Sequence, residues 1–151
     1  MIRPARPDDC GSLSDLARRS KAHWGYDDAF MSAHRQALSV DAEYISDNPT
    51  FVAEEASVAL GFYALEHVEI GLVELGFMFV EPTHIGRGIG RQLLRHASET
   101  ARSLGYVEMR IVSDPHAAGF YKQMGAEPWG EWHSPTIPGR RLPVLHLECG
   151  Q

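Results

Sequence analysis

The sequence predicts a single domain of the α+β or α/β class, built from one mixed β-sheet with flanking helices. Three observations support this prediction. Apolar residues recur at helical spacing early in the chain, and the pattern changes to strand-like alternation at 50–80. A glycine-rich turn at 84–90 then leads into a long amphipathic helix. Beyond that helix come a strand, a further helix and two final strands, which is typical of a sheet with parallel and antiparallel pairs.

The first third of the chain is predicted to be mainly helical. The expected elements are a short strand at 1–6 and helices at 7–21, 29–38 and 41–46. Pro4 is tolerated in an edge strand, where one side needs no hydrogen-bond donors. Asp27 or Asp28 is expected to cap the second helix, because an aspartate side chain accepts hydrogen bonds from free N–H groups at a helix start.

The middle of the chain is predicted to form an antiparallel meander followed by the long helix. The expected strands are 50–54, 58–67 and 70–80, with turns at 55–57 and 67–69, and the expected helix is 91–104. Consecutive strands joined by short turns pair antiparallel. Gly105 is expected to end the helix, because glycine readily adopts the left-handed conformation found there.

The last third is predicted to contain strand, helix and two strands. The expected elements are a strand at 107–112, a helix at 115–124 between Asp114 and Gly125, and strands at 126–132 and 142–149 around a proline-rich loop. Asp114 would cap this helix and Pro115 would occupy its first position. The strand at 107–112 should lie parallel to the strand that ends at Val80, because a helix connects them.

Composition limits the classes of function. The chain has 151 residues, 44% of them hydrophobic and 23% charged, as in ordinary soluble domains. Its net charge of −6 argues against a general nucleic-acid-binding protein, which needs a basic face. No signal peptide or membrane-spanning run is evident, so a cytoplasmic location without a membrane partner is expected. Cys10 and Cys149 lack metal or redox spacing and are expected to be reduced; the alternative is a disulfide that joins the two ends of the chain.

The glycine-rich turn at 84–90 is the strongest functional signal. The first N–H groups of a helix have no partners within the helix and lie at the positive end of its dipole. Together with Gly86, Arg87 and Gly88, they suit a phosphate or pyrophosphate group. The alternative is a tight turn in which glycine only relieves backbone strain.

Two motifs identify a family. The first, Val-Glu-Pro-Thr-His-Ile-Gly-Arg-Gly-Ile-Gly at 80–90, leads into the long helix. The second, Asp-Pro-His-Ala-Ala-Gly-Phe-Tyr-Lys-Gln-Met-Gly-Ala, occupies 114–126. In this order, and with these elements between them, they resemble the GNAT superfamily of acetyl-CoA-dependent N-acetyltransferases. The resemblance implies one domain over 1–151, a mostly antiparallel sheet, and splayed strands that form the acetyl-CoA cleft.

The resemblance implies acetyl-CoA as co-substrate and no metal. The cofactor-binding residues that it implies are Met78, Phe79, Val80, Ile85, Gly86, Arg87, Gly88, Ile89, Gly90 and His116. The strand residues would bind the pantetheine arm through their backbone, as an added strand would, and the turn would bind the pyrophosphate. Ile85 and His116 depart from the family, which usually has Gln or Arg at the first position and often has Asn at the second.

Tyr121 and Glu74 are the catalytic residues that the resemblance implies. Tyr121 would be the general acid, because a phenol stays protonated at neutral pH and can donate to a departing thiolate. Glu74 stands where some members carry a carboxylate base, and it would deprotonate the acceptor amine directly or through water. The alternatives are a core tyrosine beside Phe120 and a Glu74 in a salt bridge or facing solvent.

Aromatic residues at two places are candidates for the acceptor site. Trp24 and Tyr26 lie between the first two predicted helices, where this superfamily binds its acceptor, and His133 near the chain's end would close the other side. Aromatic walls suit an amine through cation–π contact. The alternative is that Trp129 and Trp132, beside His133, pack in the core or in a dimer interface.

The implied function is transfer of an acetyl group from acetyl-CoA to a primary amine by direct attack in a ternary complex. Neither motif contains a cysteine nucleophile for a covalent intermediate. The acceptor would be a small-molecule or peptide amine, and a homodimer is a family-level expectation. Two alternatives are an inactive acyl-CoA-binding module of the same fold and an ATP-binding protein, although the chain lacks the Gly-Lys-Ser/Thr ending of a phosphate-binding loop.

Overall fold

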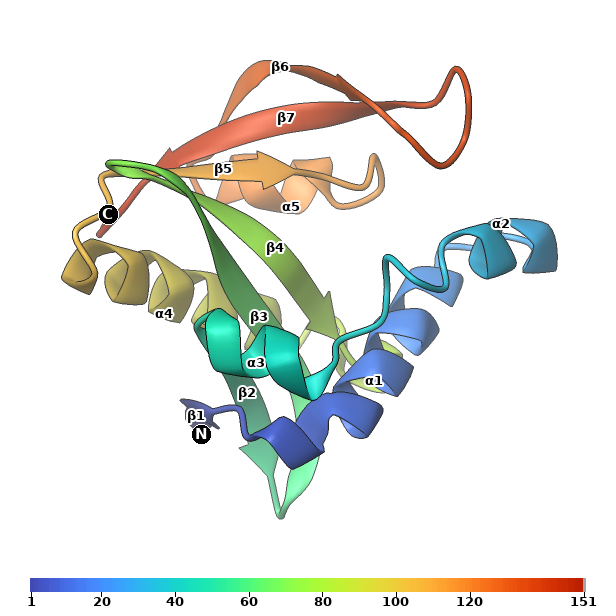
Figure 1. Ribbon diagram of the computed structural model, residues 1–151, viewed down its shortest axis with the longest axis horizontal. Coiled ribbons are helices and arrows are strands. Elements are labelled where there is room, and N and C mark those ends of the chain that lie inside the picture. The colour runs from blue at the N-terminus through green and yellow to red at the C-terminus, as the bar shows by residue number, and fades with distance from the viewer. Residues whose placement is uncertain (151) are drawn as a thin grey trace. The chain divides into compact units, whose positions relative to one another are not determined.

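Helices and strands follow the predicted order in the computed structural model, which describes residues 1–150 (Figure 1). The elements are β1 (Ile2–Pro4), η1 (Pro7–Asp9), α1 (Cys10–Ala22), α2 (Asp28–Ala33), α3 (Ala42–Asp47), β2 (Thr50–Glu55), β3 (Val58–Glu69), β4 (Leu72–Val80), η2 (Pro82–His84), α4 (Ile89–Ser103), β5 (Glu108–Val112), α5 (Ala118–Gln123), β6 (Glu127–His133) and β7 (Arg141–Glu148). The strands form a 7-stranded sheet in the order β1-β2-β3-β4-β5-β7-β6. Among the strand pairs whose register the structure describes, β4 and β5 run parallel and the others run antiparallel. The predicted mixed, mostly antiparallel sheet is confirmed.

Contacts within the chain define two compact units. Unit 1 comprises Met1–Leu65 and Phe77–Leu94, and unit 2 comprises Glu66–Gly76 and Arg95–Gln151. The chain passes from one unit to the other within β3, β4 and α4. Each unit therefore contains segments that are far apart in the sequence.

The core of unit 1 lies between its N-terminal helices and its strands. Figure 1 shows α1 and α3 against the face of β2 and β3. Leu13, Leu16 and Ala17 recur at helical spacing along α1, and all three are fully buried. They pack in one cluster with Val52 of β2 and Phe62 of β3. This amphipathic stripe is what makes the segment a helix and fixes its buried face.

Aspartate caps start the two short helices of unit 1. Asp27 accepts a hydrogen bond from the backbone N–H of Phe30 at 2.8 Å, and Asp41 accepts one from that of Tyr44 at 2.7 Å. Each carboxylate satisfies a donor that the helix itself leaves free. The predicted cap at Asp27 is confirmed.

The second helix is shorter than predicted. α2 ends at Ala33, whereas the periodicity predicted a helix to Leu38. Nδ1 of His34 lies 2.8 Å from the carbonyl oxygen of Phe30, so this side chain binds a main-chain group at the helix end. The backbone N–H of His34 donates to the same oxygen at 3.1 Å, and separate turns follow in place of a continued helix.

The turn between β3 and β4 lies at Ile70 and Gly71, so the prediction of a turn at 67–69 is wrong. Gly71 has a φ of 80°, in the left-handed region that favours glycine. β3 therefore continues to Glu69 before the chain reverses. A connection this short joins antiparallel strands.

The helix predicted to begin at Pro115 begins at Ala118. The carboxylate of Asp114 accepts a hydrogen bond from the backbone N–H of His116 at 2.8 Å. This bond spans two residues and closes a turn, whereas a helix cap would bind the N–H further along. Asp114 thus orders the segment before α5 without starting the helix itself.

Buried side chains of β5 and β7 form part of the core of unit 2. Met109 pairs with Leu147, and Ile111 pairs with Leu145, in an antiparallel register that buries all four side chains. β6 follows β7 at the edge of the sheet, and every one of its residues is exposed. In this unit α5 contacts β7.

Gly61 lies where β3 contacts the beginning of α4. A Cβ atom at this position would lie 2.9 Å from Cδ1 of Leu93 and 2.9 Å from the backbone oxygen of Phe79. The backbone oxygen cannot move aside as a flexible side chain can. We expect Gly61→Ala to lower the free energy of unfolding by about 1–3 kcal/mol, because the added methyl overpacks the site. Denaturant unfolding followed by circular dichroism measures this change.

Gly11 of α1 provides the matched control. An added Cβ there meets nothing within 4 Å, and the residue does not have a positive φ. We expect Gly11→Ala to leave the free energy of unfolding unchanged or to raise it by up to about 1 kcal/mol, since alanine favours the helix. A Gly61→Ala protein as stable as the wild type would contradict the close approach of β3 and α4.

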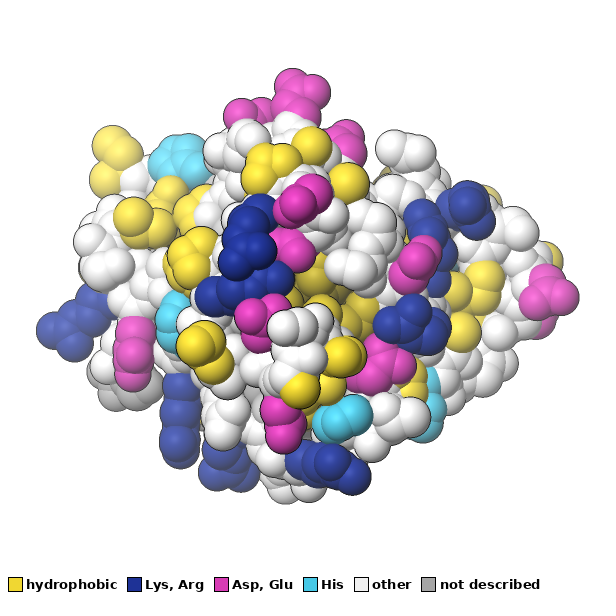
Figure 2. All heavy atoms as spheres, turned by 90° about the horizontal axis from the view of Figure 1, so that it is seen from below, with side chains coloured by type: hydrophobic (Ala, Val, Ile, Leu, Met, Phe, Trp, Pro, Cys, Tyr) yellow, Lys and Arg dark blue, Asp and Glu magenta, His cyan; other side chains and the backbone are white. Residues whose placement is uncertain are grey.

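Surface charge is mixed on the face shown in Figure 2. Lys and Arg side chains lie interspersed with Asp and Glu side chains there, with apolar side chains between them. Across residues 1–150, no helix combines the length and the apolar character needed to cross a membrane.

Candidate active site

In unit 1, an ion pair supports the chain just after β4. Arg19 of α1 donates hydrogen bonds to both carboxylate oxygens of Glu81, from Nε at 3.1 and 3.2 Å and from Nη2 at 2.7 Å. The backbone N–H of Glu81 donates to the carbonyl oxygen of Leu60 in β3 at 2.8 Å. The glycine-rich turn therefore begins from a residue held by both a helix and a strand.

The glycines of the turn allow a close approach to its backbone. Gly86 and Gly88 have φ values of 90° and 84°, which favour glycine over other residues. An ideal Cβ at either position would meet nothing within 4 Å. The space beside both glycines is thus open, and their role is conformational.

The backbone N–H groups at the start of α4 are free. Within residues 1–150, those of Gly86, Gly88, Ile89, Gly90 and Arg91 donate to no acceptor. The N-terminus of a 15-residue helix adds the positive end of its dipole. Together these groups have the geometry that suits an anion, and the exposed Arg87 adds a positive charge beside them.

β4 extends beyond its pairing with β5. The parallel pairs cover Leu72, Val73 and Glu74 of β4, which then continues to Val80. In the described chain, the last residues of β4 have β3 as their sheet partner and no register with β5. Backbone groups of Met78 and Val80 on that side are available to a ligand.

In unit 2, Tyr121 of α5 is buried and keeps its proton. Its side chain packs edge-on against Phe120, with ring centroids 5.2 Å apart, and the residue is 6% exposed. Burial raises the pKa of the hydroxyl above its ordinary value of 10.0, and the negative charge of Asp114 raises it further. No acceptor for this hydroxyl lies among residues 1–150. It is therefore a neutral donor with its proton unused.

Glu74 forms an ion pair. Nε of Arg110 donates to Oε1 of Glu74 at 2.7 Å, and the two residues make the last parallel pair between β4 and β5. The side chains are 24% exposed for Glu74 and 35% exposed for Arg110. The salt bridge considered for Glu74 from the sequence is thus present, and its second oxygen, Oε2, has no partner in residues 1–150.

His116 is held by Asp114 in the turn before α5. Nδ1 of His116 lies 2.9 Å from Oδ1 of Asp114, which also accepts from the backbone of His116. Nη2 of Arg140 lies 3.7 Å from the other oxygen of Asp114. The exposed imidazole therefore has a fixed orientation that its position in the sequence did not reveal.

Trp24 and Tyr26 lie in unit 1, in the turn after α1. Tyr26 stacks on Phe30 with ring centroids 3.8 Å apart, and Nζ of Lys21 lies 5.4 Å from the centroid of Tyr26. Trp24 is exposed and makes an edge contact with His23. A cation–π contact already exists here within the protein.

His133 lies in unit 2, at the end of β6, and it is exposed. Trp129 and Trp132 on the same strand are 51% and 46% exposed, so they do not pack in the core. The ring centroid of Trp129 lies 5.0 Å from that of His146 in β7.

The predicted site residues divide between the two units. Those in unit 1 are Trp24, Tyr26, Met78, Phe79, Val80, Ile85, Gly86, Arg87, Gly88, Ile89 and Gly90; those in unit 2 are Glu74, His116, Tyr121 and His133. Two further residues, Arg110 and Asp114, were not identified as site residues from the sequence. Arg110 binds Glu74, which lies 36 positions away in the sequence. This contact can be predicted only when the register of β4 and β5 is known.

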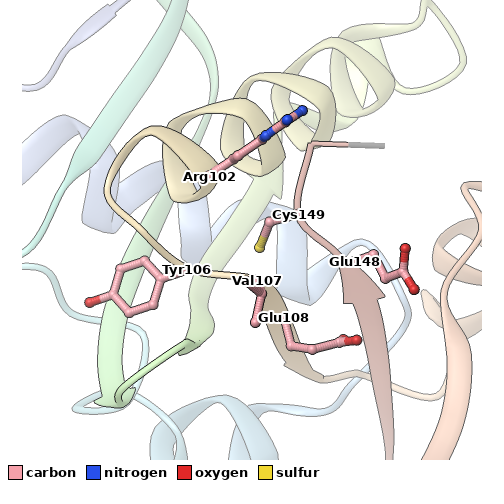
Figure 3. Close-up of a pocket in the computed structure, with 6 residues that line it drawn as sticks. All are labelled: Arg102, Tyr106, Val107, Glu108, Glu148 and Cys149. Atoms are coloured by element: carbon pink, nitrogen blue, oxygen red, sulfur yellow. The ribbon is translucent and has the colours of Figure 1, made fainter.

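A hollow of about 370 Å³ opens in unit 2 away from the predicted residues (Figure 3). It is lined by Arg102, Tyr106, Val107, Glu108, Glu148 and Cys149. Burial, and secondarily the charge of Glu108, raises the pKa of the Cys149 thiol to about 11. The thiol is therefore neutral at physiological pH and a poor nucleophile.

Both cysteines are free thiols. Among residues 1–150, no group of three or more His, Cys, Asp or Glu side chains is arranged to hold a metal ion.

The fold thus places an open glycine turn and a helix start with free N–H groups directly after β4 of a mixed sheet. Residues 46–125 match the family described as "Acetyltransferase (GNAT) domain", a match over more than half of the chain. The chain belongs to the GNAT family, and it is an acetyl-CoA-dependent N-acetyltransferase.

Two relatives and one solved structure are similar to this chain over nearly its whole length, at low sequence identity. A thialysine N-epsilon-acetyltransferase of Sus scrofa is 26% identical, covering 96% of each chain. A peptidyl-lysine N-acetyltransferase of Salmonella typhimurium is 28% identical, covering 97% of this chain and 95% of the relative. The PaiA N-acetyltransferase of Thermoplasma acidophilum, solved in complex with coenzyme A, has a TM-score of 0.80 at 19% identity, covering 98% of both chains. At this sequence identity, the similarity to the PaiA structure shows a shared fold alone.

Proposed function

We propose that this protein transfers the acetyl group of acetyl-CoA to a primary amine by direct attack within a ternary complex, with residues 1–151 acting as one catalytic domain. The observation that carries the proposal is the set of free backbone N–H groups at the start of α4, those of Gly86, Gly88, Ile89, Gly90 and Arg91. Relatives named as acetyltransferases of thialysine and of peptidyl-lysine support an amine acceptor.

The binding of acetyl-CoA would depend mainly on the backbone. The amides of Gly86, Gly88 and Gly90 would bind its pyrophosphate, which explains why Ile85, whose side chain is exposed, can stand where relatives use a polar residue. The end of β4, from Met78 to Val80, would bind the pantetheine arm as a neighbouring strand would. His116, with its orientation fixed by Asp114, would donate one further hydrogen bond.

The reaction needs three proton transfers, because the acceptor nitrogen loses two protons and the departing thiolate gains one; the second nitrogen proton would return to Tyr121 after it has protonated the thiolate. The acceptor ammonium must lose a proton before its nitrogen attacks the thioester carbon, and Oε2 of Glu74 would accept that proton directly or through water. The C–N bond forms and the C–S bond breaks. The hydroxyl of Tyr121 would donate its proton to the departing thiolate, since its raised pKa keeps it protonated. Trp24, Tyr26 and His133 would line the acceptor site.

Calorimetric titration of the purified protein tests the proposal. We expect acetyl-CoA and CoA to bind with similar affinity, and ATP to bind far more weakly, because the pantetheine contacts of β4 need the longer ligand. Free-thiol release in the presence of a panel of amines then measures transfer.

The outcomes distinguish the alternatives. Binding of CoA without thiol release from any amine would favour an inactive acyl-CoA-binding module. ATP binding in the absence of CoA binding would favour a nucleotide-binding protein.

A further inference from the structure

Arg110 has donors that the protein does not use. A guanidinium has several N–H donors in a planar fork, and here only Nε has a partner, Oε1 of Glu74 at 2.7 Å. Within residues 1–150, neither Nη atom of Arg110 makes a hydrogen bond. The side chain is 35% exposed, so a ligand can reach this edge.

Glu74 fixes the position of that guanidinium and keeps one oxygen free. The two residues are paired in the parallel register of β4 and β5, so their side chains leave the sheet on the same face. The bond through Nε orients the fork, and Oε2 of Glu74 remains without a partner in the described chain. The two Nη atoms of the positively charged Arg110 side chain thus lie beside the free oxygen Oε2 of Glu74.

The nearest charged neighbours on β5 and β7 are paired with each other, and Glu127 of β6 stands one strand further along the same row, in register with His146. In register with Arg110 on β7 stands His146, whose Nδ1 lies 3.1 Å from Oε2 of Glu108. These two side chains therefore satisfy one another and do not compete for the Nη atoms of Arg110. Trp129, which is exposed, contacts His146 and offers an apolar surface next to these charged side chains.

We propose that Arg110 and Glu74 recognise the acceptor as a free α-amino acid. The two Nη atoms of Arg110 bind the α-carboxylate in a bidentate arrangement, and Oε2 of Glu74 accepts a hydrogen bond from the α-ammonium group. An α-amino acid carries these opposite charges on one carbon, which matches an ion pair presented side by side. The inference rests on the proposed function and names its substrate class.

The same contacts give the reaction its proton balance. The α-ammonium group transfers one proton to Glu74, the neutral nitrogen forms a bond to the acetyl carbon, and the carbon–sulfur bond breaks. Tyr121 transfers its proton to the thiolate, and the second proton that the nitrogen loses as the amide forms returns to Tyr121; the proton on Glu74 passes to solvent. The products are an N-acetyl amino acid and CoA. Amines without a carboxylate leave the Arg110 donors unpaired, which lowers their affinity.

The test compares each proteinogenic L-amino acid with its carboxamide, in which the carboxylate is replaced by a neutral group. Thiol release gives kcat/KM for both forms. For the wild type we expect the free acid to exceed the carboxamide by about 10- to 100-fold, because a charge-assisted bidentate contact is lost. Arg110→Gln should bring this ratio close to one, chiefly by raising KM for the acid, and Arg110→Lys should give an intermediate ratio because lysine lacks the fork.

Arg95→Gln is the matched control, since Arg95 is an exposed arginine of α4 in the same unit. It should leave the ratio at the wild-type value. Thermal unfolding of each variant establishes that it is folded, and the wild-type comparison of acid with carboxamide needs no variant at all.

The outcomes separate this inference from the proposed function. Thiol release with n-butylamine or a lysine-containing peptide, but with no free amino acid, would overturn the inference and leave the proposed function standing. Equal kcat/KM for acid and carboxamide, or an unchanged ratio in Arg110→Gln, would also overturn it. Absence of release with every amine would overturn both.

Discussion

Tyr121→Phe is expected to lower the turnover number by about 100- to 10,000-fold, the usual contribution of a general acid. Acetyl-CoA affinity should change little, because the substitution removes only the hydroxyl. Stability should also change little, since that hydroxyl has no hydrogen-bond partner in the described chain. Steady-state kinetics at saturating substrates, together with calorimetric titration and thermal unfolding, measure the three quantities.

Tyr106→Phe is the matched control for this substitution. The hydroxyl of Tyr106 lies 2.7 Å from Nδ1 of His67, in the same unit and outside the predicted site. Its removal should cost about 1 kcal/mol of stability and leave turnover unchanged. A Tyr121→Phe enzyme with wild-type turnover would mean that water or another group protonates the thiolate.

Gly88→Glu is expected to abolish acetyl-CoA binding, with a loss of affinity of at least about 100-fold. The new carboxylate would lie among the free N–H groups at the start of α4, where it occupies the anion site and repels the pyrophosphate. The fold should persist, because an added Cβ meets nothing within 4 Å, although the φ of 84° costs about 1–2 kcal/mol for a residue other than glycine. Calorimetric titration measures the affinity.

Gly105→Glu is the matched control for Gly88→Glu. It introduces the same charge and a similar backbone strain at a position outside the glycine-rich turn. Gly105 lies beyond the other end of α4, has a φ of 95°, and likewise has open space around it. It should lose similar stability and bind acetyl-CoA as the wild type does. If Gly88→Glu also bound acetyl-CoA normally, the turn would not be part of the cofactor site.

Local patterns made most of the fold predictable from the sequence. The stripe of Leu13, Leu16 and Ala17 identified α1, and the aspartate cap of α2 was evident from residue type alone. The errors lie where one hydrogen bond or one backbone conformation decides a boundary. α2 ends where the side chain and the backbone N–H of His34 both bind the carbonyl oxygen of Phe30, and Gly71, in the left-handed region, sets the turn between β3 and β4.

The candidate site was predictable where it is continuous in the sequence. The turn containing Gly86 and Gly88 was identified because its residues are neighbours in one motif. Arg110 could not be assigned in this way, since its partner Glu74 lies on another strand and the pairing depends on register. The fixed orientation of His116 likewise depends on the turn that Asp114 closes.

The exposed edge strand β6 has a consequence for how copies of this protein behave at high concentration. A free strand edge offers N–H and C=O groups to which another chain can add. Pro128 lacks one of these donors, and the register shift between Pro128 and Gly130 bends the strand away from a flat template. Glu127 adds a negative charge that repels the same residue of a second copy, whereas Glu131 is paired with Arg141 at 3.5 Å. Edge-to-edge association, and with it fibril-like aggregation, is thereby opposed by the strand's own sequence.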